Sequence, residues 1–149
     1  MRSMKLLTQV RYSIRVLLDL SMNQREGVVR IAEIASRQKI SIKYLERIIQ
    51  PLKEAGFVMS KRGRNGGHTL AMPPEAISLA DIVRIFEEDT AEADFQCGLP
   101  GYQDALIREA WQEAKQAFYL RLARITLADL SLDTTRKRWS DSEILIFCE

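Results

Sequence analysis

The side chains best suited to chemistry in this sequence are cations in and just before one glycine-rich stretch. That stretch is the run Lys61-Arg62-Gly63-Arg64-Asn65-Gly66-Gly67. Guanidinium and ammonium groups bind phosphate oxygens, and arginine can do so with paired hydrogen bonds. Upstream, one face of a predicted helix carries polar and charged side chains, namely Lys43, Tyr44, Glu46, Arg47, Gln50 and Lys53. The chemistry that these residue types support is recognition of double-stranded DNA.

The charge of the chain is divided unevenly between its two halves. Residues 1–72 hold 14 Lys and Arg against 5 Asp and Glu, whereas residues 73–149 hold 8 against 15. The halves therefore carry about +9 and about −7, which together make the net charge of +2. A basic module of this kind is the electrostatic footprint of a phosphate-binding surface. The alternative, cations that merely solvate a surface, explains the segregation less well.

Residues 41–55 are predicted to form the helix that presents these polar groups. Its apolar stripe consists of Leu45, Ile48, Ile49 and Leu52. Ser41 is expected to cap the start of the helix, and Gly56 is expected to end it in a left-handed conformation. Pro51 lacks an amide hydrogen and should bend the helix. Bases would then be met by the half of the helix that precedes Pro51.

A β-hairpin is predicted after this helix. Short extended runs at residues 57–60 and 68–71 flank the basic stretch. Asn65-Gly66 is the strongest turn signal, because both residue types tolerate positive φ. A helix next to a cationic hairpin is how a winged helix-turn-helix protein meets DNA.

The elements before this module are predicted to be scaffold helices. Residues 4–22 have an apolar face, and Arg11 and Tyr12 on the same helix could reach phosphates. Val28 and Val29 are expected to form a small strand that pairs with the predicted β-hairpin, which is the wing of the module. A short helix from Ile31 to about Gln38 completes the helix-turn-helix.

The second half of the chain is predicted to contain a helix, an acidic loop and a long dimerisation helix. Ser78-x-x-Asp81 resembles a capping box, and residues 87–94 are acidic. Residues 102–130 are predicted to be one long helix with an apolar band wider than its own domain needs, which favours a two-fold dimer. The proposed dimer contacts are Leu106, Ala110, Trp111, Ala114, Ala117, Phe118, Leu122 and Ile125. A dimer would meet a pseudo-palindromic site on DNA.

Other classes of function find little support. One histidine and two distant cysteines offer no pair of nucleophile and base, so we predict no enzyme and no catalytic residue. His68 is interpreted as a strand residue. No apolar run is long enough to span a membrane, and the N-terminus lacks the pattern of a signal peptide. We therefore expect a cytoplasmic protein without a membrane partner.

Three segments together resemble one bacterial regulator family. They are KLLTQVRYSIRVLLDL, IAEIASRQKISIKYLERIIQPLKEAGFVMSKRGRNGGHTLA and the late ITLADL, and the resemblance spans roughly residues 4–130. The family is that of the Rrf-two type winged-helix regulators, which includes IscR, NsrR and CymR. The resemblance implies a mainly helical fold with a small β-hairpin wing, and a homodimeric DNA-binding regulator, which we expect to be a repressor.

The resemblance also implies roles for matching residues. The start of the recognition helix would enter the major groove, and Arg62 of the wing would enter the minor groove. For Glu46, a cytosine amine or a neighbouring side chain of the same helix are both open as partners. The full predicted DNA-binding set is Arg11, Tyr12, Ser41, Lys43, Tyr44, Glu46, Arg47, Lys61, Arg62, Gly63, Arg64 and Asn65.

The implied organisation has four parts. They are a DNA-binding domain at residues 1–74, a connecting helix and loop at 75–101, a dimerisation helix at 102–132 and a tail at 133–149.

The chain departs from this family in its cysteines. Cluster-binding members carry three cysteines in the loop before the long helix, whereas this chain has Cys97 alone there. An iron–sulfur cluster needs several thiolates at once, so we predict no conventional three-cysteine cluster and no other metal or cofactor. Cys97 could instead be a redox-sensing thiol or an ordinary cysteine, and a partner protein or metabolite could act at the acidic loop. A winged helix that binds protein rather than DNA is a further alternative.

Overall fold

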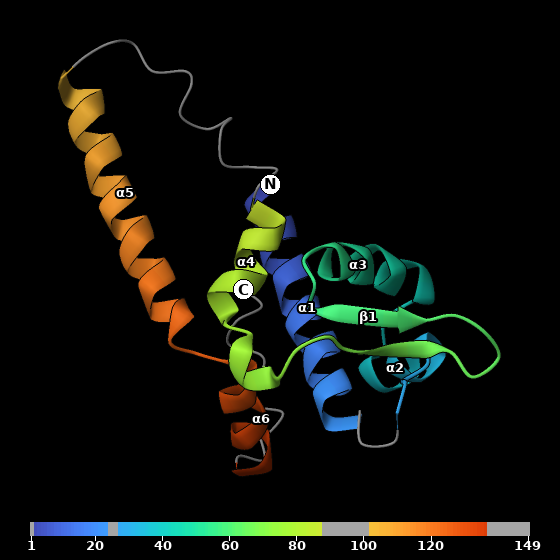
Figure 1. Ribbon diagram of the computed structural model, residues 1–149. Helices are drawn as coiled ribbons and strands as arrows, with labels where there is room; N and C mark the ends of the chain where they lie inside the picture. The colour runs from blue at the N-terminus through green and yellow to red at the C-terminus, as the bar shows by residue number, and fades with distance from the viewer. Residues whose placement is uncertain (1, 24–26, 88–101, 137–149) are drawn as a thin grey trace.

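The computed structural model describes residues 2–23, 27–87 and 102–136 of the chain (Figure 1). In chain order the elements are α1 (Arg2–Asn23), α2 (Ile31–Gln38), α3 (Ile42–Glu54), β1 (Val58–Lys61), β2 (Gly67–Leu70), the 3-10 turn η2 (Pro74–Ala76), α4 (Leu79–Glu87), α5 (Tyr102–Ala123) and α6 (Leu127–Arg136). The two strands form an antiparallel hairpin in which Val58 faces Leu70 and Lys61 faces Gly67. The mainly helical winged-helix fold predicted from the sequence is confirmed.

One apolar core joins α1, α2 and α3 to α4 and α6. Its innermost side chains come from six segments of the chain, and each is at most 1% exposed: Val16, Leu17, Leu20, Ile34, Leu45, Ile48, Leu52, Ile77, Ile82 and Leu127. The stripe predicted for residues 41–55 is the buried face of α3. Its polar face is consequently turned outward.

The ends of α3 follow the local signals in the sequence. The Ser41 hydroxyl accepts a hydrogen bond from the backbone N–H of Tyr44 at 3.2 Å, as an N-cap should. Gly56 has φ +80°, a left-handed conformation that favours glycine after a helix. Pro51 lies inside α3. The predicted cap and stop are therefore both confirmed.

The hairpin is present, but the turn differs from the one expected. The loop between the strands runs from Arg62 to Gly66, and the positive φ, +111°, occurs at Gly63. Asn65 and Gly66 do not adopt positive φ, so the expectation that Asn65-Gly66 forms the turn by positive φ is wrong. The backbone N–H of Gly66 donates to the carbonyl of Gly63 at 3.0 Å, which closes a longer loop.

A backbone bridge attaches the wing to the segment before α2. Val29 and His68 exchange two hydrogen bonds, each 2.8 Å long. The predicted pairing of this segment with the wing is thus confirmed, but as a single bridge at Val29 rather than as a strand. A Cβ on Gly67 would lie 2.6 Å from the carbonyl oxygen of Val29, so the close approach requires glycine there.

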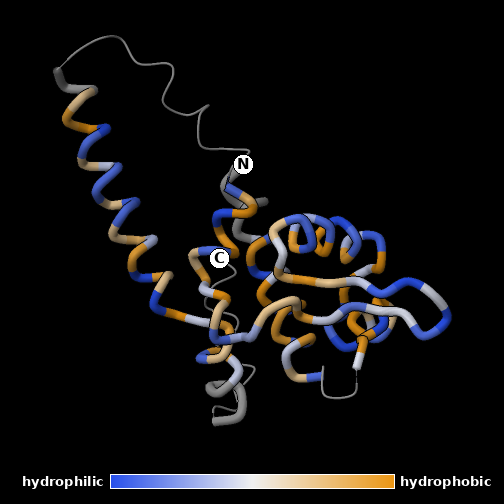
Figure 2. Tube along the Cα trace, viewed as in Figure 1, coloured by the Kyte–Doolittle hydropathy of each residue, from blue (hydrophilic) through white to orange (hydrophobic). Residues whose placement is uncertain are grey.

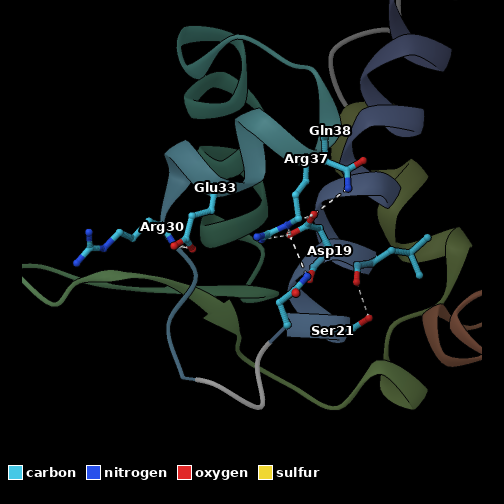
Figure 3. A network of polar contacts seen from close by, with 8 residues as sticks. Asp19, Ser21, Arg30, Glu33, Arg37 and Gln38 are labelled. Atoms are coloured by element: carbon cyan, nitrogen blue, oxygen red, sulfur yellow. Dashed lines mark hydrogen bonds and ion pairs between the residues drawn. The ribbon is translucent and has the colours of Figure 1, made fainter.

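A network around a buried carboxylate holds α2 against α1 (Figure 3). The Asp19 side chain is 2% exposed, and Arg37 donates to it from both Nε and Nη2, the latter at 2.7 Å. Gln38 Nε2 donates to the same carboxylate at 2.8 Å. Arg15 completes the network, because its Nε donates to Gln38 Oε1 at 3.1 Å. These bonds fix the end of α2, from which the turn into α3 begins.

The long helix predicted for residues 102–130 is wrong, because two helices occupy this region. α5 ends at Ala123 and α6 starts at Leu127, with Thr126 and Asp129 forming a capping box between them. Thr126 Oγ1 accepts from the backbone N–H of Asp129 at 3.2 Å, and the Asp129 carboxylate accepts from both Thr126 N and Oγ1 at 2.9 Å. These bonds lower the pKa of Asp129.

The break also pairs with the turn before α4. Ser78 and Thr126 form a bridge, in which Leu79 N–H donates to Ile125 and Leu127 N–H donates to Ile77. The predicted capping box at the start of α4 is confirmed, since Ser78 Oγ donates to Asp81 at 2.6 Å and accepts from the N–H of Asp81. Two capping boxes therefore lie side by side, and α6 turns into the core.

α5 projects away from the rest of the molecule and exposes much of its surface (Figures 1 and 2). Large apolar side chains stand on it in contact with solvent, namely Leu106, Ile107, Trp111, Phe118 and Leu120. At its C-terminal half it packs on α4, where Lys115 pairs with Glu87 at 3.2 Å and Arg84 lies over the Tyr119 ring. Among the described residues, none of the helices has the length and apolar character needed to cross a membrane.

Candidate nucleic-acid interface

Aromatic and cationic side chains meet where α1 lies beside the start of α3. The rings of Tyr12 and Tyr44 contact edge to face, with centroids 5.4 Å apart. The guanidinium groups of Arg11 and Arg15 lie 5.3 Å and 5.4 Å from the Tyr12 ring. Three residues predicted from the sequence to contact DNA, Arg11, Tyr12 and Tyr44, are thereby brought together. Arg15 extends this cluster, although it also holds Gln38.

The outward face of α3 carries the rest of the predicted recognition residues. Lys43, Glu46 and Arg47 are exposed, and Ser41 is exposed at the cap. No ion pair joins Glu46 to a neighbour within the described part of the chain. Cations, a carboxylate and a hydroxyl can donate to or accept from base edges in a major groove. This face is available for such contacts.

The predicted wing residues line an open groove between the hairpin and the start of α2. The groove has a volume of about 520 Å³, and five cations border it, from three parts of the chain: Arg30, Lys53, Lys61, Arg62 and Arg64. All the other residues that line it are uncharged apart from the titratable His68. Lys61, Arg62, Gly63 and Arg64 thus gather at one site, and Asn65 is exposed in the same loop.

His68 lies in β2 on the wall of this groove, as the interpretation of it as a strand residue requires. Its Nδ1 lies 2.8 Å from Ser60 Oγ on the facing strand. Burial of the ring, and secondly the positive charge of Lys53, lower the pKa of His68 below the usual value of 6.5. The ring therefore favours its neutral form.

Two cations of the groove, Arg30 and Lys53, were absent from the set predicted from sequence. Arg30 stands just before α2, where its backbone N–H donates to Glu33 at 3.1 Å (Figure 3). The bridge from Val29 to His68 carries Arg30 to the wing. The expected pairing of Val28 and Val29 with the wing was the signal that could have placed it. Lys53 lies on the polar face of α3, at the end away from Ser41.

The sensor and dimer predictions meet the structure only in part. Cys97 lies outside the described residues, as does most of the acidic loop. Of the proposed dimer contacts, Leu106, Ala110, Trp111, Ala114, Ala117 and Phe118 are exposed on α5, Leu122 is half-buried, and Ile125 lies in the break after α5. Within the described part of the chain, no group of three or more His, Cys, Asp or Glu side chains is placed to hold a metal ion.

A helix-turn-helix with an outward polar second helix and a cationic wing defines the class of winged-helix transcriptional regulators. Residues 6–133 match the family model Rrf2, described as an iron-dependent transcriptional regulator. The chain belongs to this Rrf2 family of DNA-binding transcriptional regulators. The family resemblance found in the sequence is confirmed, and so is the prediction that the protein is not an enzyme.

Relatives and solved structures of similar length support this membership. The chain is 42% identical to protein rrf2 of Nitratidesulfovibrio vulgaris over 89% of this chain and 90% of that protein. It is 31% identical to the regulator IscR of Aliivibrio salmonicida, over 94% and 84%. Among solved structures, T. potens IscR superposes with a TM-score of 0.69 at 30% identity, covering 93% of each chain. CymR, the global cysteine regulator of B. subtilis, superposes with a TM-score of 0.66 at 31% identity, covering 83% and 93%.

Proposed function

We propose that this chain is a sequence-specific repressor that binds a pseudo-palindromic DNA site as a homodimer in the cytoplasm. The observation that carries the proposal is the outward placement of Lys43, Glu46 and Arg47 on a helix whose start is fixed by a cap and whose neighbour is a cationic wing. The polar face of α3 would enter the major groove, and Arg62 would follow the minor groove.

The experiment is selection of genomic fragments by the purified full chain, followed by affinity measurement on the selected site. Arg47→Ala and Arg62→Ala are each expected to cost about 1–3 kcal/mol of binding free energy per half-site, or about 2–6 kcal/mol for the dimer, if they read bases. The matched control is Arg108→Ala, an exposed arginine on α5. No enrichment of a common site, or equal losses for all three variants, would contradict the proposal.

The homodimer is supported by the surface of α5. Ile107, Trp111 and Phe118 are 61%, 60% and 54% exposed in the single chain, and helical spacing places them on one face of α5. A 22-residue helix is about 33 Å long, so a second copy of it could cover these side chains along their length. Uncovered apolar patches of this kind mark association surfaces. A pseudo-palindromic site consists of two matching half-sites, so the partner that it implies is another copy of this chain.

Sedimentation tests the dimer directly. Wild-type protein should sediment as a dimer, and Trp111→Ser with Phe118→Ser should shift it toward monomer and weaken binding to the paired site. The control is Gln112→Ser, which changes an exposed polar side chain on the same helix. Lys115 is unsuitable as a control, because it pairs with Glu87 of α4. A wild-type monomer that binds the site fully would exclude this arrangement.

The donor set does not fit an iron–sulfur cluster of the family type. The chain has two cysteines, Cys97 and Cys148, and carboxylates are hard ligands that replace thiolates poorly on iron–sulfur centres. Protein purified without oxygen is expected to be colourless. A broad visible absorption band with stoichiometric iron and sulfide would contradict this.

A further inference from the structure

The groove beside the wing gathers five cationic side chains, and no acidic side chain among the described residues of its walls balances their charge. Arg30 comes from the start of α2, Lys53 from the end of α3, and the remaining cations from the wing. No carboxylate lines the groove. Cations that face one another across open space repel, unless an anion lies between them. The arrangement therefore has the chemistry of an anion-binding site.

The groove is also partly organised before any ligand arrives. Arg30 Nη2 lies 3.5 Å from the carbonyl oxygen of Arg64, so the start of α2 reaches the tip of the wing. The bridge between Val29 and His68 ties the same two segments through the backbone. Gly63, Gly66 and Gly67 place no side chain in the space between the walls. Two walls held at a set separation lose little freedom when an anion binds.

We infer that this groove holds a backbone phosphate of the DNA duplex, with Arg30 and Lys53 as positioning contacts. This inference rests on the proposed DNA-binding function. A duplex phosphate is favoured over a free anion because the groove is open and its wing wall is the predicted DNA-contacting loop. Phosphate contacts set the register of a protein on DNA without reading sequence. The two residues therefore contribute affinity, while α3 supplies specificity.

The experiment measures the salt dependence of DNA affinity for the full chain. Arg30→Gln and Lys53→Gln are compared with wild type on the selected site and on an unrelated duplex of equal length. Each lost phosphate contact should lower the slope of log affinity against log salt by about 0.9. Each substitution removes one contact from each protomer, so the dimer loses two. Between about 50 and about 200 mM salt, each variant should then weaken about twelvefold less than wild type. The preference for the selected site should stay unchanged.

Three further variants separate charge, fold and base recognition. Arg30→Lys keeps the cation and should keep the wild-type slope. Arg108→Gln removes an exposed cation from α5 and should also keep it. Arg62→Gln, in contrast, should reduce the preference for the selected site. A thermal unfolding curve for each variant shows whether the fold persists.

The remaining outcomes overturn one proposal or the other. If Arg30→Gln and Lys53→Gln keep the full slope, the groove holds no phosphate. If they lose preference for the selected site instead, they contact bases and the inference is wrong. If inorganic pyrophosphate at constant ionic strength binds wild type but not these variants, and does so without displacing DNA, the groove binds a free anion rather than the backbone. A wild-type protein without salt-dependent DNA affinity would refute the proposed function itself.

Discussion

Replacing Arg37 by glutamine is expected to destabilise the fold more than replacing its partner Asp19 by asparagine. The two residues form a buried-to-surface ion pair: the Asp19 side chain is 2% exposed, whereas the Arg37 side chain is 40% exposed. Arg37→Gln leaves a buried carboxylate without its cation. Asp19→Asn leaves a guanidinium that can turn toward water. The cost should therefore depend on which partner is removed.

The magnitudes follow from the hydrogen bonds that remain. A buried charge that loses its partner typically costs 3–5 kcal/mol. Gln38 still donates to the Asp19 carboxylate at 2.8 Å, so we expect the lower end, about 3 kcal/mol, for Arg37→Gln. In Asp19→Asn, the side-chain oxygen of the asparagine still accepts a hydrogen bond, but its NH₂ group faces a donor from Arg37 or Gln38. We therefore expect a cost of about 1–2 kcal/mol. Either loss is a large share of the stability of a small protein.

The assay is urea unfolding followed by circular dichroism of the helices. Protein concentration is held constant, because association would raise the apparent stability. Arg108→Gln, an exposed arginine on α5, controls for the loss of a surface cation. Equal costs for the two variants, or a larger cost for Asp19→Asn, would refute the reasoning from burial.

Three smaller predictions follow from single contacts. Gly67→Ala should unfold at lower temperature than wild type, because its Cβ would lie 2.6 Å from the carbonyl oxygen of Val29, and the loss should exceed that of Ala76→Gly at an exposed turn. His68→Gln should flatten the pH dependence of unfolding: the pKa of His68 is lowered in the fold, so the unfolded chain takes up the proton first and wild-type stability falls as pH drops below about 6.5. Thr126→Ala should cost about 1 kcal/mol in urea unfolding, because it removes the cap of α6, whereas Thr126→Ser should cost much less.

The helix α3 illustrates what local sequence can predict. Ser41 caps α3, the apolar stripe is buried, and Gly56 ends the helix, all as expected. Each of these features depends on residues within a few positions of one another. A capping hydroxyl, a helical period and a left-handed glycine act over one or two turns, so the sequence alone contains the information.

Thr126 and Asp129 show how a local signal can be present and still be overlooked. Their Thr-x-x-Asp spacing matches that of Ser78 and Asp81, which predicted the start of α4 correctly. The continuous apolar spacing through residues 102–130 favoured a single helix instead. Leu127, which fits that spacing, is fully buried in the core rather than exposed on α5. Periodicity reports which residues are apolar, but it does not say which of them share a helix.

Composition, capping and periodicity are properties of the chain, so they were enough to predict the class of fold and the basic module, and the resemblance of three segments indicated the family. The tertiary structure decided where α5 ends, since the bridge between Ser78 and Thr126 joins segments far apart in the chain. It also decided which residues line the groove, because the bridge between Val29 and His68 brings Arg30 to the wing. Such contacts depend on how the chain packs on itself, and no short stretch of sequence specifies that packing.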